Sequence, residues 1–418
     1  ALWREMLPAD FVEVERLTRI YFDKTFFPYP LSLRATLAGM GLRRSSRAVA
    51  SWMHARARPV RPEVSFEDWV VNRFGRELYA TFFKTYTEKV WGVPADELEA
   101  DWAAQRIRGL SMLSVLRNAL LPRRGGGGPS SLIDRFLYPR RGAGQLWEAV
   151  RDEIVVAGGR VELGQRVVGL EHHGGRVGAV RTQDGNVYEG SHVHATLTLE
   201  QLVGALDPAP PAPVLAAGRA LRHRDFLVVA LLVDKGPLFP DQWIYVHDPD
   251  VRVARITNAA NWNADMSPPD GRTAITMEYF CNRGDDLWAR SDHDLLELAA
   301  RELTAIGFGS AVSGVEGRVH RSVDTYPVYD DDYAAHRRTL AAWIRDELVN
   351  VFPAGRKGLH NYNSQDHAMM SALLSVRNAI EGTAFDVWSV NTDEEYAEEG
   401  GADGGLEERL VPRTVPAG

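Results

Sequence analysis

The sequence predicts an α/β protein in which a mixed sheet with helices is inserted between two parts of another domain. Strand-like and helix-like segments alternate along the chain, and residues 226–233 form a continuously apolar run that is typical of a buried strand. The proline-rich segment 208–213 marks a boundary ahead of that run. The length of 418 residues is enough for two domains with ordinary cores.

Composition limits the class of protein. The chain is 45% hydrophobic and 25% charged, as globular proteins are, and its net charge of −8 argues against nucleic acid binding. The single cysteine, Cys281, excludes an internal disulfide and is typical of a reducing compartment. No apolar run approaches the roughly 20 residues of a transmembrane helix, and no signal peptide is visible. We therefore expect a cytoplasmic protein.

The first quarter of the chain predicts a strand and then a long helix. Residues 19–30 are rich in aromatic and β-branched residues and are stopped by prolines, which favours a strand. Ser65 precedes the helix, and Asp68 three positions later completes a capping box. The buried stripe of this helix is expected at Trp69, Val70, Phe74, Leu78, Phe82 and Tyr86.

The middle of the chain predicts a helix followed by several strands. Gly142 and Gly144 begin a helix that runs to about Ala157 and ends at a Gly-Gly pair. Gly-Gly at 174–175 and Asp-Gly at 184–185 indicate hairpins. The expected strands are 160–170, 176–181, 186–189, 192–196, 226–233, 243–247, 251–256 and 273–280, and a helix is expected over 292–306. Alternation in two of these strands, 243–247 and 251–256, predicts a sheet with one solvent-exposed face.

Segment 355–370, Gly-Arg-Lys-Gly-Leu-His-Asn-Tyr-Asn-Ser-Gln-Asp-His-Ala-Met-Met, predicts a loop that leads into a helix. Beyond it, apolar residues recur at helical spacing at Leu373, Val376 and Ile380. The start of this helix exposes unpaired N–H groups and the positive end of the helix dipole, which favour an anion or a polar ligand. The alternative is a capped surface helix, because Asn, Ser and Asp are all favoured at helix N-termini.

Within this segment, the pattern Gly355-Arg356-x-Gly358-x-x-x-Tyr362-x-x-x-Asp366 resembles the C-terminal flavin-binding segment of the UDP-galactopyranose mutase family. More broadly, it is similar to the FAD-dependent amine oxidase and protoporphyrinogen oxidase superfamily. The resemblance implies FAD as cofactor and an FAD/NAD(P)-binding, Rossmann-like domain of the amine oxidase type, N-terminally incomplete and with an inserted substrate domain. Departures from the mutase pattern weaken the mutase interpretation alone: Lys357, His360, Ser364 and Gln365 stand where Leu, Tyr, Asp and Met are usual.

The resemblance also implies cofactor-binding residues. In that superfamily the loop and the helix N-terminus lie along the isoalloxazine ring and the ribityl chain of the flavin. A hydrophobic residue placed like Val167 presents backbone groups to the adenine. The implied cofactor-binding residues are Val167, Arg356, Gln365, Asp366, His367, Ala368 and Met369.

A second stretch implies a substrate site. Residues 86–92, Tyr-Thr-Glu-Lys-Val-Trp-Gly, resemble the mutase pattern, whose tryptophan and a following arginine help hold a nucleotide sugar. They correspond to Trp91 and, allowing one inserted residue, to Arg106. Arg255 aligns loosely with a second mutase arginine that contacts the substrate diphosphate, and Tyr362 completes the implied substrate-binding set. Structural alternatives stay open, namely a core residue at a helix end for the tryptophan and surface residues for the two arginines.

The dinucleotide-binding turn Gly-x-Gly-x-x-Gly is missing from the sequence. Gly142-Ala143-Gly144 is the nearest candidate, but Trp147 replaces the third glycine. The resemblance covers residues 1–396 and begins after the family's first βαβ unit, so we expect either a fragment or a chain that naturally lacks this unit. In both cases the main pyrophosphate contacts are lost, and we expect poor affinity for FAD.

A metal site is not expected. His192 and His194 share one face of an expected strand, but no third ligand follows at suggestive spacing. Hydrolases with a G-x-S-x-G elbow and P-loop enzymes are also not favoured, because neither motif occurs in the sequence.

We therefore predict an FAD-dependent oxidoreductase of the amine oxidase or protoporphyrinogen oxidase type that acts on a small molecule, with the flavin itself carrying the redox chemistry. Two alternatives stay open, a mutase-like isomerase acting on a nucleotide sugar and a truncated, non-catalytic flavoprotein homologue. The expected domains are a helical, substrate-side segment (1–130), two parts of an FAD domain (131–215 and 346–396), a substrate-binding domain (216–345) and a disordered tail (397–418).

Overall fold

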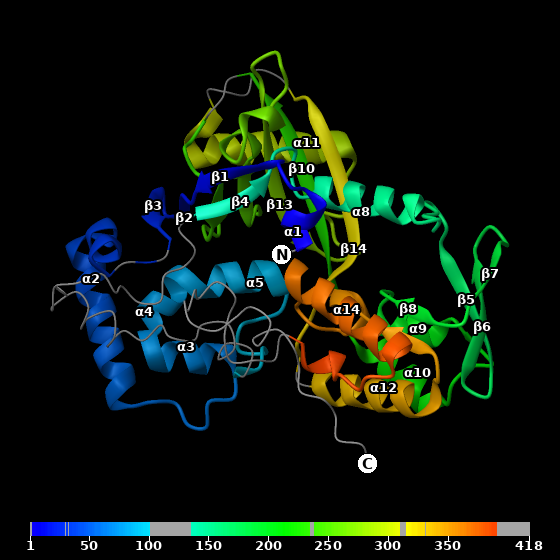
Figure 1. Cartoon of the computed structure of the whole chain (residues 1–418). Coiled ribbons are helices and arrows are strands. Elements are labelled where there is room, and N and C mark those ends of the chain that lie inside the picture. The colour runs from blue at the N-terminus through cyan, green and yellow to red at the C-terminus, as the bar shows by residue number, and fades with distance from the viewer. Residues whose placement is uncertain are drawn as a thin grey trace, which may run out of the picture. The chain divides into compact units, whose positions relative to one another are not determined.

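The computed structural model describes residues 2–29, 31, 33–100, 135–234, 238–309, 315–330 and 332–390 (Figure 1). These residues divide into two compact units. The first unit lies within Ala1–Val161 and Asp225–Val323, and the second unit lies within Glu162–Arg224 and Asp324–Tyr396. Each unit is therefore assembled from two separate stretches of the chain. The assignment of residues to cofactor-side and substrate-side domains stays a prediction.

A seven-stranded sheet is the centre of the first unit, and its strands lie in the order β14-β10-β13-β12-β11-β2-β3. Its strands are β2 (Thr18–Phe22), β3 (Thr25–Pro28), β10 (His223–Val233), β11 (Trp243–Val246), β12 (Arg255–Asn258), β13 (Thr273–Cys281) and β14 (Gly317–Pro327). β11 pairs with β2 in parallel, whereas β10–β13, β12–β13, β11–β12 and β2–β3 are antiparallel pairs. The apolar run of β10 is confirmed as an interior strand, because β14 and β13 flank it.

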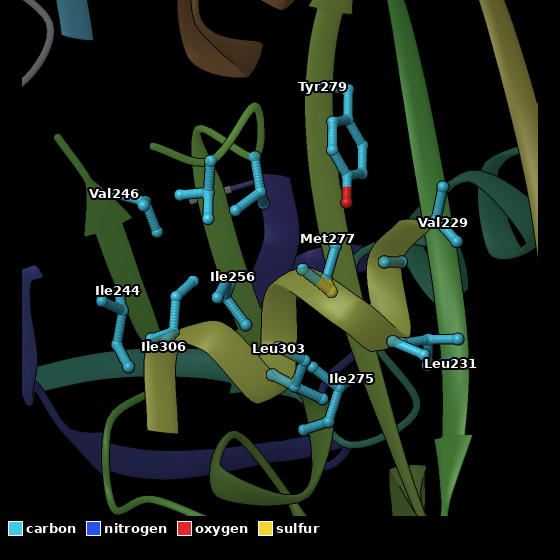
Figure 2. Packing of buried hydrophobic residues seen from close by; sticks show 14 of the residues in the cluster. Val229, Leu231, Ile244, Val246, Ile256, Ile275, Met277, Tyr279, Leu303 and Ile306 are labelled. Carbon is cyan, nitrogen blue, oxygen red and sulfur yellow. The ribbon is translucent and has the colours of Figure 1, made fainter. Parts of the chain in front are cut away.

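Alternation of side chains gives this sheet two different faces. One face packs against α11 (Asp292–Leu303) and the π-helical turn Thr304–Phe308, and it forms the main hydrophobic core (Figure 2). Its buried residues include Val229, Leu231, Ile244, Val246, Ile256, Ile275, Met277, Tyr279, Leu303 and Ile306. Burial of each such side chain stabilises the fold by about 1.5–3 kcal/mol. The opposite face carries the half-buried Trp243, Tyr245 and Arg255, so it is less buried than the core face but is not the solvent-exposed face that the alternation predicted.

Helices and one further strand pair complete the described part of the first unit. The helices are α1 (Leu2–Met6), α2 (Leu33–Ala57), α3 (Phe66–Phe74), α4 (Arg76–Tyr79), α5 (Thr85–Trp91) and α8 (Gly144–Val156), with a π-helical turn over Ala80–Lys84. β1 (Phe11–Glu15) pairs antiparallel with β4 (Arg135–Pro139). The helix expected after Gly142 is confirmed as α8.

The long helix expected after Ser65 is interrupted. Its capping box is confirmed, since Ser65 Oγ accepts from the Asp68 amide at 3.1 Å and the Asp68 carboxylate accepts from the Ser65 amide at 3.2 Å. The helix breaks at Gly75, where φ is 82°. A Cβ at Gly75 would lie 2.6 Å from the Trp52 amide nitrogen of α2, so the close approach of two backbones requires a glycine there.

The second unit contains two small sheets with helices packed around them. β8 (Val193–Ala195) and β15 (Val351–Pro353) form a parallel pair. β7 (Val187–Glu189), β6 (Arg176–Thr182), β5 (Val167–His173) and β9 (Leu206–Asp207) form a four-stranded sheet in that order. The helices are α9 (Leu199–Gly204), α10 (Ala212–Ala220), α12 (Tyr333–Glu347), α13 (Gly355–Gly358) and α14 (Gln365–Glu381). Their core contains Leu170, Leu199, Leu202, Leu340 and Ile344.

Several expected boundaries were wrong. Residues 19–30 form the hairpin β2–β3, because Asp23 and Lys24 adopt positive φ values of 49° and 57° without the usual glycine signal. The strands expected at 160–170 and 251–256 begin only at Val167 and Arg255. The strand expected at 192–196 is confined to β8 and is only partly buried. α11 ends at Leu303 and continues as the π-helical turn.

The helix expected after residue 364 is confirmed as α14, but its apolar spacing does not mark the buried side. Leu373, Val376 and Ile380 are all exposed, whereas Ser371 and Leu374 are buried. The reason is tertiary, since Ser371 accepts a hydrogen bond from the Gly355 amide at 2.9 Å. Among the described helices, none combines the length and hydrophobicity that a membrane crossing requires.

We predict that Gly75→Ala destabilises the protein by about 2–4 kcal/mol, because an L-residue is strained at this φ and its Cβ would collide with α2. Thermal unfolding followed by circular dichroism measures the change. Gly144→Ala is the matched control, because no atom lies within 4 Å of its added Cβ, and we expect it to leave the midpoint unchanged or slightly raised. Equal midpoints for the two variants would contradict the prediction.

Candidate functional site

The loop between α13 and α14 in the second unit is held by Arg356. Its Nε donates to the Asn363 carbonyl at 2.9 Å, and Nη1 donates to the Thr325 carbonyl at 3.5 Å. The guanidinium lies 4.9 Å from the ring centroids of both Tyr326 and Tyr362, which stack on each other at 5.5 Å. Arg356 and Tyr362, two residues of the sequence pattern, are therefore in contact, and the arginine joins the end of the loop at Asn363 to Thr325 of β14.

A tyrosine hydroxyl fixes the middle of this loop. The Tyr362 amide donates to Tyr329 Oη at 2.6 Å, and this hydroxyl donates to Asn361 Oδ1 at 3.1 Å. Asn361 Nδ2 in turn donates to the Val390 carbonyl at 2.9 Å. The loop is thus hydrogen-bonded to two flanking segments, which preorganises its backbone for binding.

The glycines of the pattern allow α13 to lie against the end of β8. The Ala354 amide donates to the Ala195 carbonyl at 2.9 Å. A Cβ at Gly358 would lie 2.6 Å from the same carbonyl oxygen, so any larger residue would push α13 away. Gly355 has a φ of 76°, which favours glycine. Gly358 is therefore explained by close packing of the backbone, and Gly355 by its positive φ.

The N-terminus of α14 carries the residues expected to meet a ligand. Gln365 and Asp366 are exposed and His367 is buried. Ser364 occupies the N-cap, but its side chain does not cap a backbone N–H group; it bonds instead to Asp366 Oδ1 at 2.5 Å and to His367 Nδ1 at 2.7 Å. The arrangement differs from the capped surface helix that was the alternative, because the capping side chain is turned toward its neighbours.

Asn363 is the one residue of this loop whose side chain is buried without a partner in the part of the chain that the structure describes. It is 2% exposed, and neither its Oδ1 nor its Nδ2 has a hydrogen bond. Leaving such a group unpaired costs about 1–3 kcal/mol. A ligand that offers both an acceptor and a donor would remove this cost. Sequence analysis missed this residue, although the position of Asn363 directly before the N-cap was a usable signal.

His360 is buried behind the loop as a neutral residue. It has a positive φ of 44°, and its Nδ1 lies 3.3 Å from Nε2 of His223. Burial, reinforced by the charge of a protonated His223, lowers the pKa of His360 well below its usual value. The departure from the mutase pattern at this position therefore places a neutral histidine beside His223 inside the second unit.

Val167, the residue expected near the adenine, lies at the start of β5. It is half-buried and pairs with Thr182 of β6. Among the described residues, no hydrogen bond joins Val167 to the loop between α13 and α14. Its role therefore stays a prediction.

In the first unit, Trp91 ends α5 and is 3% exposed, so it is an interior residue there. Arg106 lies outside the described residues. Arg255 is half-buried, and its Nε and Nη2 lie 2.7 Å and 2.6 Å from Glu278 Oε2. Burial alone would lower the pKa of Arg255, but the Glu278 carboxylate raises it well above its usual range. The positive charge of Arg255 is thus already compensated within the sheet, because β12 and β13 pair these two residues.

A buried histidine lies next to the end of α5. His247 stacks on Tyr86 at 4.7 Å and its Nδ1 is buried without a hydrogen bond. Lys89 Nζ donates to the carbonyls of Val246, Asp248 and Val253 at 3.2, 2.7 and 3.0 Å. Burial lowers the pKa of Lys89 to about 8. Burial, followed by the charge of Lys89, lowers the pKa of His247 to about 3.

The implied substrate-binding set is therefore not gathered in one place within a single unit. Tyr362 belongs to the second unit, whereas Trp91 and Arg255 belong to the first. The implied cofactor set is gathered more closely, because all of its members belong to the second unit and six of the seven, all but Val167, lie in α13 or in the first five residues of α14.

Comparison with known proteins places these features in context. Residues 7–380 match the family model described as flavin containing amine oxidoreductase. Among solved structures, the chain is similar to reduced UDP-galactopyranose mutase, with 17% identity, a TM-score of 0.74 and coverage of 91% of this chain and 81% of that chain.

Two other solved structures show the same likeness. For a CLA-producing fatty acid isomerase from P. acnes, the identity is 15%, the TM-score 0.56 and the coverage 90% of this chain and 84% of that chain. For a putrescine oxidase with redesigned cofactor binding, the identity is 13%, the TM-score 0.56 and the coverage again 90% and 84%. At these identities the likeness shows the fold alone.

We predict that His247 makes the protein sensitive to acid. Its folded pKa of about 3 lies below the unfolded value, so the unfolded chain binds an extra proton between these two values. The contribution of neutral His247 to the free energy of unfolding is therefore fully present above about pH 6.5. It decreases as the pH falls toward 3, by up to about 1.4 kcal/mol per pH unit.

His247→Phe keeps a ring against Tyr86 and removes this titration, so its unfolding midpoint should fall less steeply than that of the wild type between pH 6.5 and 4.5. The exposed His54, changed to Gln, is the control and should keep the wild-type slope. Thermal scans at several pH values make the comparison. Parallel slopes for His247→Phe and the wild type would show that the buried histidine is not responsible.

Proposed function

Because the chain belongs to the flavin-containing amine oxidoreductases, a family whose cofactor is FAD, we propose that it is an FAD-dependent oxidoreductase acting on a small-molecule substrate. The observation that supports this proposal is the loop between α13 and α14. That loop combines a rigid backbone, an uncapped helix start and the unpaired buried side chain of Asn363. A cytoplasmic location is part of the proposal and is supported by the single cysteine.

The residues of this loop fit one side of a flavin. A flavin ring offers carbonyl acceptors and an N–H donor along one edge, and Asn363 has an unused donor and an unused acceptor. The first turn of α14 adds the positive end of a helix of 17 residues, which favours electron-rich groups. When bound, the flavin supplies the redox chemistry itself.

The protein's own residues supply position and polarity. Arg356, in contact with two tyrosine rings, holds the loop that carries Asn363. We propose that Gln365 and Asp366 meet the ribityl hydroxyls, because both are exposed at the helix start and both can accept hydrogen bonds. The backbone of His367, Ala368 and Met369 would line the same edge, and Val167 would meet the adenine.

The fit covers only part of FAD. The sequence contains no Gly-x-Gly-x-x-Gly turn, and such turns supply the backbone N–H groups that hold a pyrophosphate. We therefore expect weak retention of FAD by this chain. The non-catalytic alternative predicts no retention at all, so the measurement below separates the two.

The mutase-like alternative has less support from the side chains. The arginine expected to hold a diphosphate, Arg255, is already paired with Glu278. A diphosphate placed there would face the Glu278 carboxylate as well as the arginine, and like charges repel. The tryptophan expected beside the sugar, Trp91, is interior to the first unit.

We predict that Asn363→Leu and Asp366→Ala each weaken FAD retention at least about fivefold, because each removes hydrogen-bonding atoms that the flavin would use. The measurement is the visible flavin absorbance that remains after incubation with FAD and desalting. Arg377→Gln, on the exposed side of α14, is the matched control and should retain flavin as the wild type does. Asn363→Leu should not lower the unfolding midpoint without FAD, since it replaces an unpaired polar group. Equal retention by all three variants would remove this site assignment.

We further predict that Arg255 does not contribute to the binding of UDP, as measured by calorimetry. The wild type and Arg255→Ala should give the same weak or absent signal, because Glu278 neutralises the arginine. Saturable binding that Arg255→Ala weakens about tenfold would instead favour the mutase-like alternative.

A further inference from the structure

A row of half-buried aromatic side chains lies on the half-buried face of the seven-stranded sheet, the face without α11. Its members are Tyr29, Tyr86, Phe136, Tyr138, Trp243, Tyr245 and Trp262, and we call it the aromatic face. The rings are in contact along the row: Trp243 stacks on Trp262 at 5.6 Å with an angle of 6°, and Trp262 stacks on Tyr138 at 4.4 Å. None of these side chains belongs to the hydrophobic core around α11.

Arg16 lies on this face, and the described part of the chain gives it no anionic partner. Its guanidinium carbon is 5.3 Å from the Tyr29 ring centroid and 5.6 Å from that of Trp243. Its Nε is buried and has no hydrogen bond, and no carboxylate of the described residues forms an ion pair with it. The contrast with Arg19 is informative, because Asp241 accepts from Arg19 Nε at 2.8 Å and from Nη2 at 2.6 Å. Within the described residues, a carboxylate therefore pairs with Arg19 and none pairs with Arg16.

Two further polar groups on this face are also unpaired. Thr18 is 2% exposed, yet its hydroxyl has no hydrogen bond within the described residues, and neither has the buried indole N–H of Trp243. The parallel pairing of β2 with β11 sets Thr18 directly opposite Trp243, so the two side chains share a face. Arg16, Thr18 and Trp243 therefore bring three unused donors to one part of the aromatic face. Burying donors that have no acceptor costs folding free energy, and a ligand that provides acceptors would remove this cost.

We propose that Arg16, Thr18 and Trp243 form an anion subsite, and that the aromatic face binds the planar or apolar body to which the anion is attached. The ligand class is a carboxylate or phosphate carried by an aromatic or apolar group. An arginine fork suits both anions, and stacking on tryptophan suits a flat body. That this ligand is the enzyme's substrate rests on the proposed function. Binding of the ligand to the aromatic face does not require a flavin. A purely cationic amine is disfavoured, because Arg16 would repel it.

The test is a calorimetric titration of the full chain, without added flavin, with phenyl phosphate and with phenylacetate. We expect saturable binding of at least one of them, at least about fivefold tighter than inorganic phosphate or benzyl alcohol, because neither control offers both a ring and an anion. Benzyl alcohol that binds as tightly as the anions would overturn the anion subsite. Inorganic phosphate that binds as tightly as phenyl phosphate would overturn the role of the aromatic face.

Substitutions of single residues test whether Arg16 binds the anion. Arg16→Gln should weaken it about tenfold, Arg16→Lys should weaken it less, and Arg301→Gln, on α11 at the other face of the sheet, should have no effect. Circular dichroism establishes that each variant is folded. Undiminished binding by Arg16→Gln would overturn the proposal, as would the absence of binding in the wild type.

Thr18→Val separates a ligand site from a structural role. It removes the unpaired hydroxyl, so it should raise the unfolding midpoint of the free protein by up to about 3 °C while weakening binding of the anion. A lowered midpoint with unchanged binding would show that the hydroxyl serves the fold. Because none of these titrations contains FAD, their failure is distinct from a failure of flavin retention.

Discussion

The seven-stranded sheet of the first unit depends on one constraint, which is that successive side chains of a strand point to opposite faces. On one face, residues such as Ile244 and Met277 are buried completely against α11 and the π-helical turn that follows it (Figure 2). On the other face, the intervening residues Trp243 and Tyr245 are only half-buried. A one-residue shift in register would exchange the two faces, so the same alternation that builds the core also presents the aromatic face.

A second constraint is that buried polar groups need hydrogen-bond partners. In both units, some buried polar side chains have no partner among the described residues. Asn350 shows the usual outcome, since its amide donates to the carbonyls of Val177 and Ser191 and its oxygen accepts from the Val177 amide. Asn363 and Thr18 are buried to a similar degree, but their side chains are left unpaired within the described residues. Unpaired groups cost folding free energy, so their presence in loops and sheet faces that are otherwise well bonded points toward ligands.

Family membership and local geometry answer different questions about this protein. The family match accounts for the fold and the cofactor class. It does not decide which substrate is bound, because the same fold carries a mutase, an isomerase and an oxidase among the similar structures. Arg255 illustrates the difference: the motif alone suggested a diphosphate ligand, whereas the antiparallel register of β12 and β13 gives it Glu278 as a partner.

The sequence by itself determined the elements with strong local signals. The capping box at Ser65, the apolar strand β10, the hairpins marked by Gly-Gly and Asp-Gly, and the helix that follows residue 364 all depend on contacts within a few residues. The cofactor class was also implied by the sequence, through the resemblance of the pattern that begins at Gly355 to the flavin-binding segment of a known family. Tertiary structure decided the rest. The break at Gly75 depends on the approach of α2, and the buried side of α14 depends on Ser371 meeting α13 rather than on its apolar stripe. The pairing of Arg19 with Asp241 joins residues 222 positions apart, so no local pattern encodes it, and among the described residues no carboxylate does the same for the nearby Arg16.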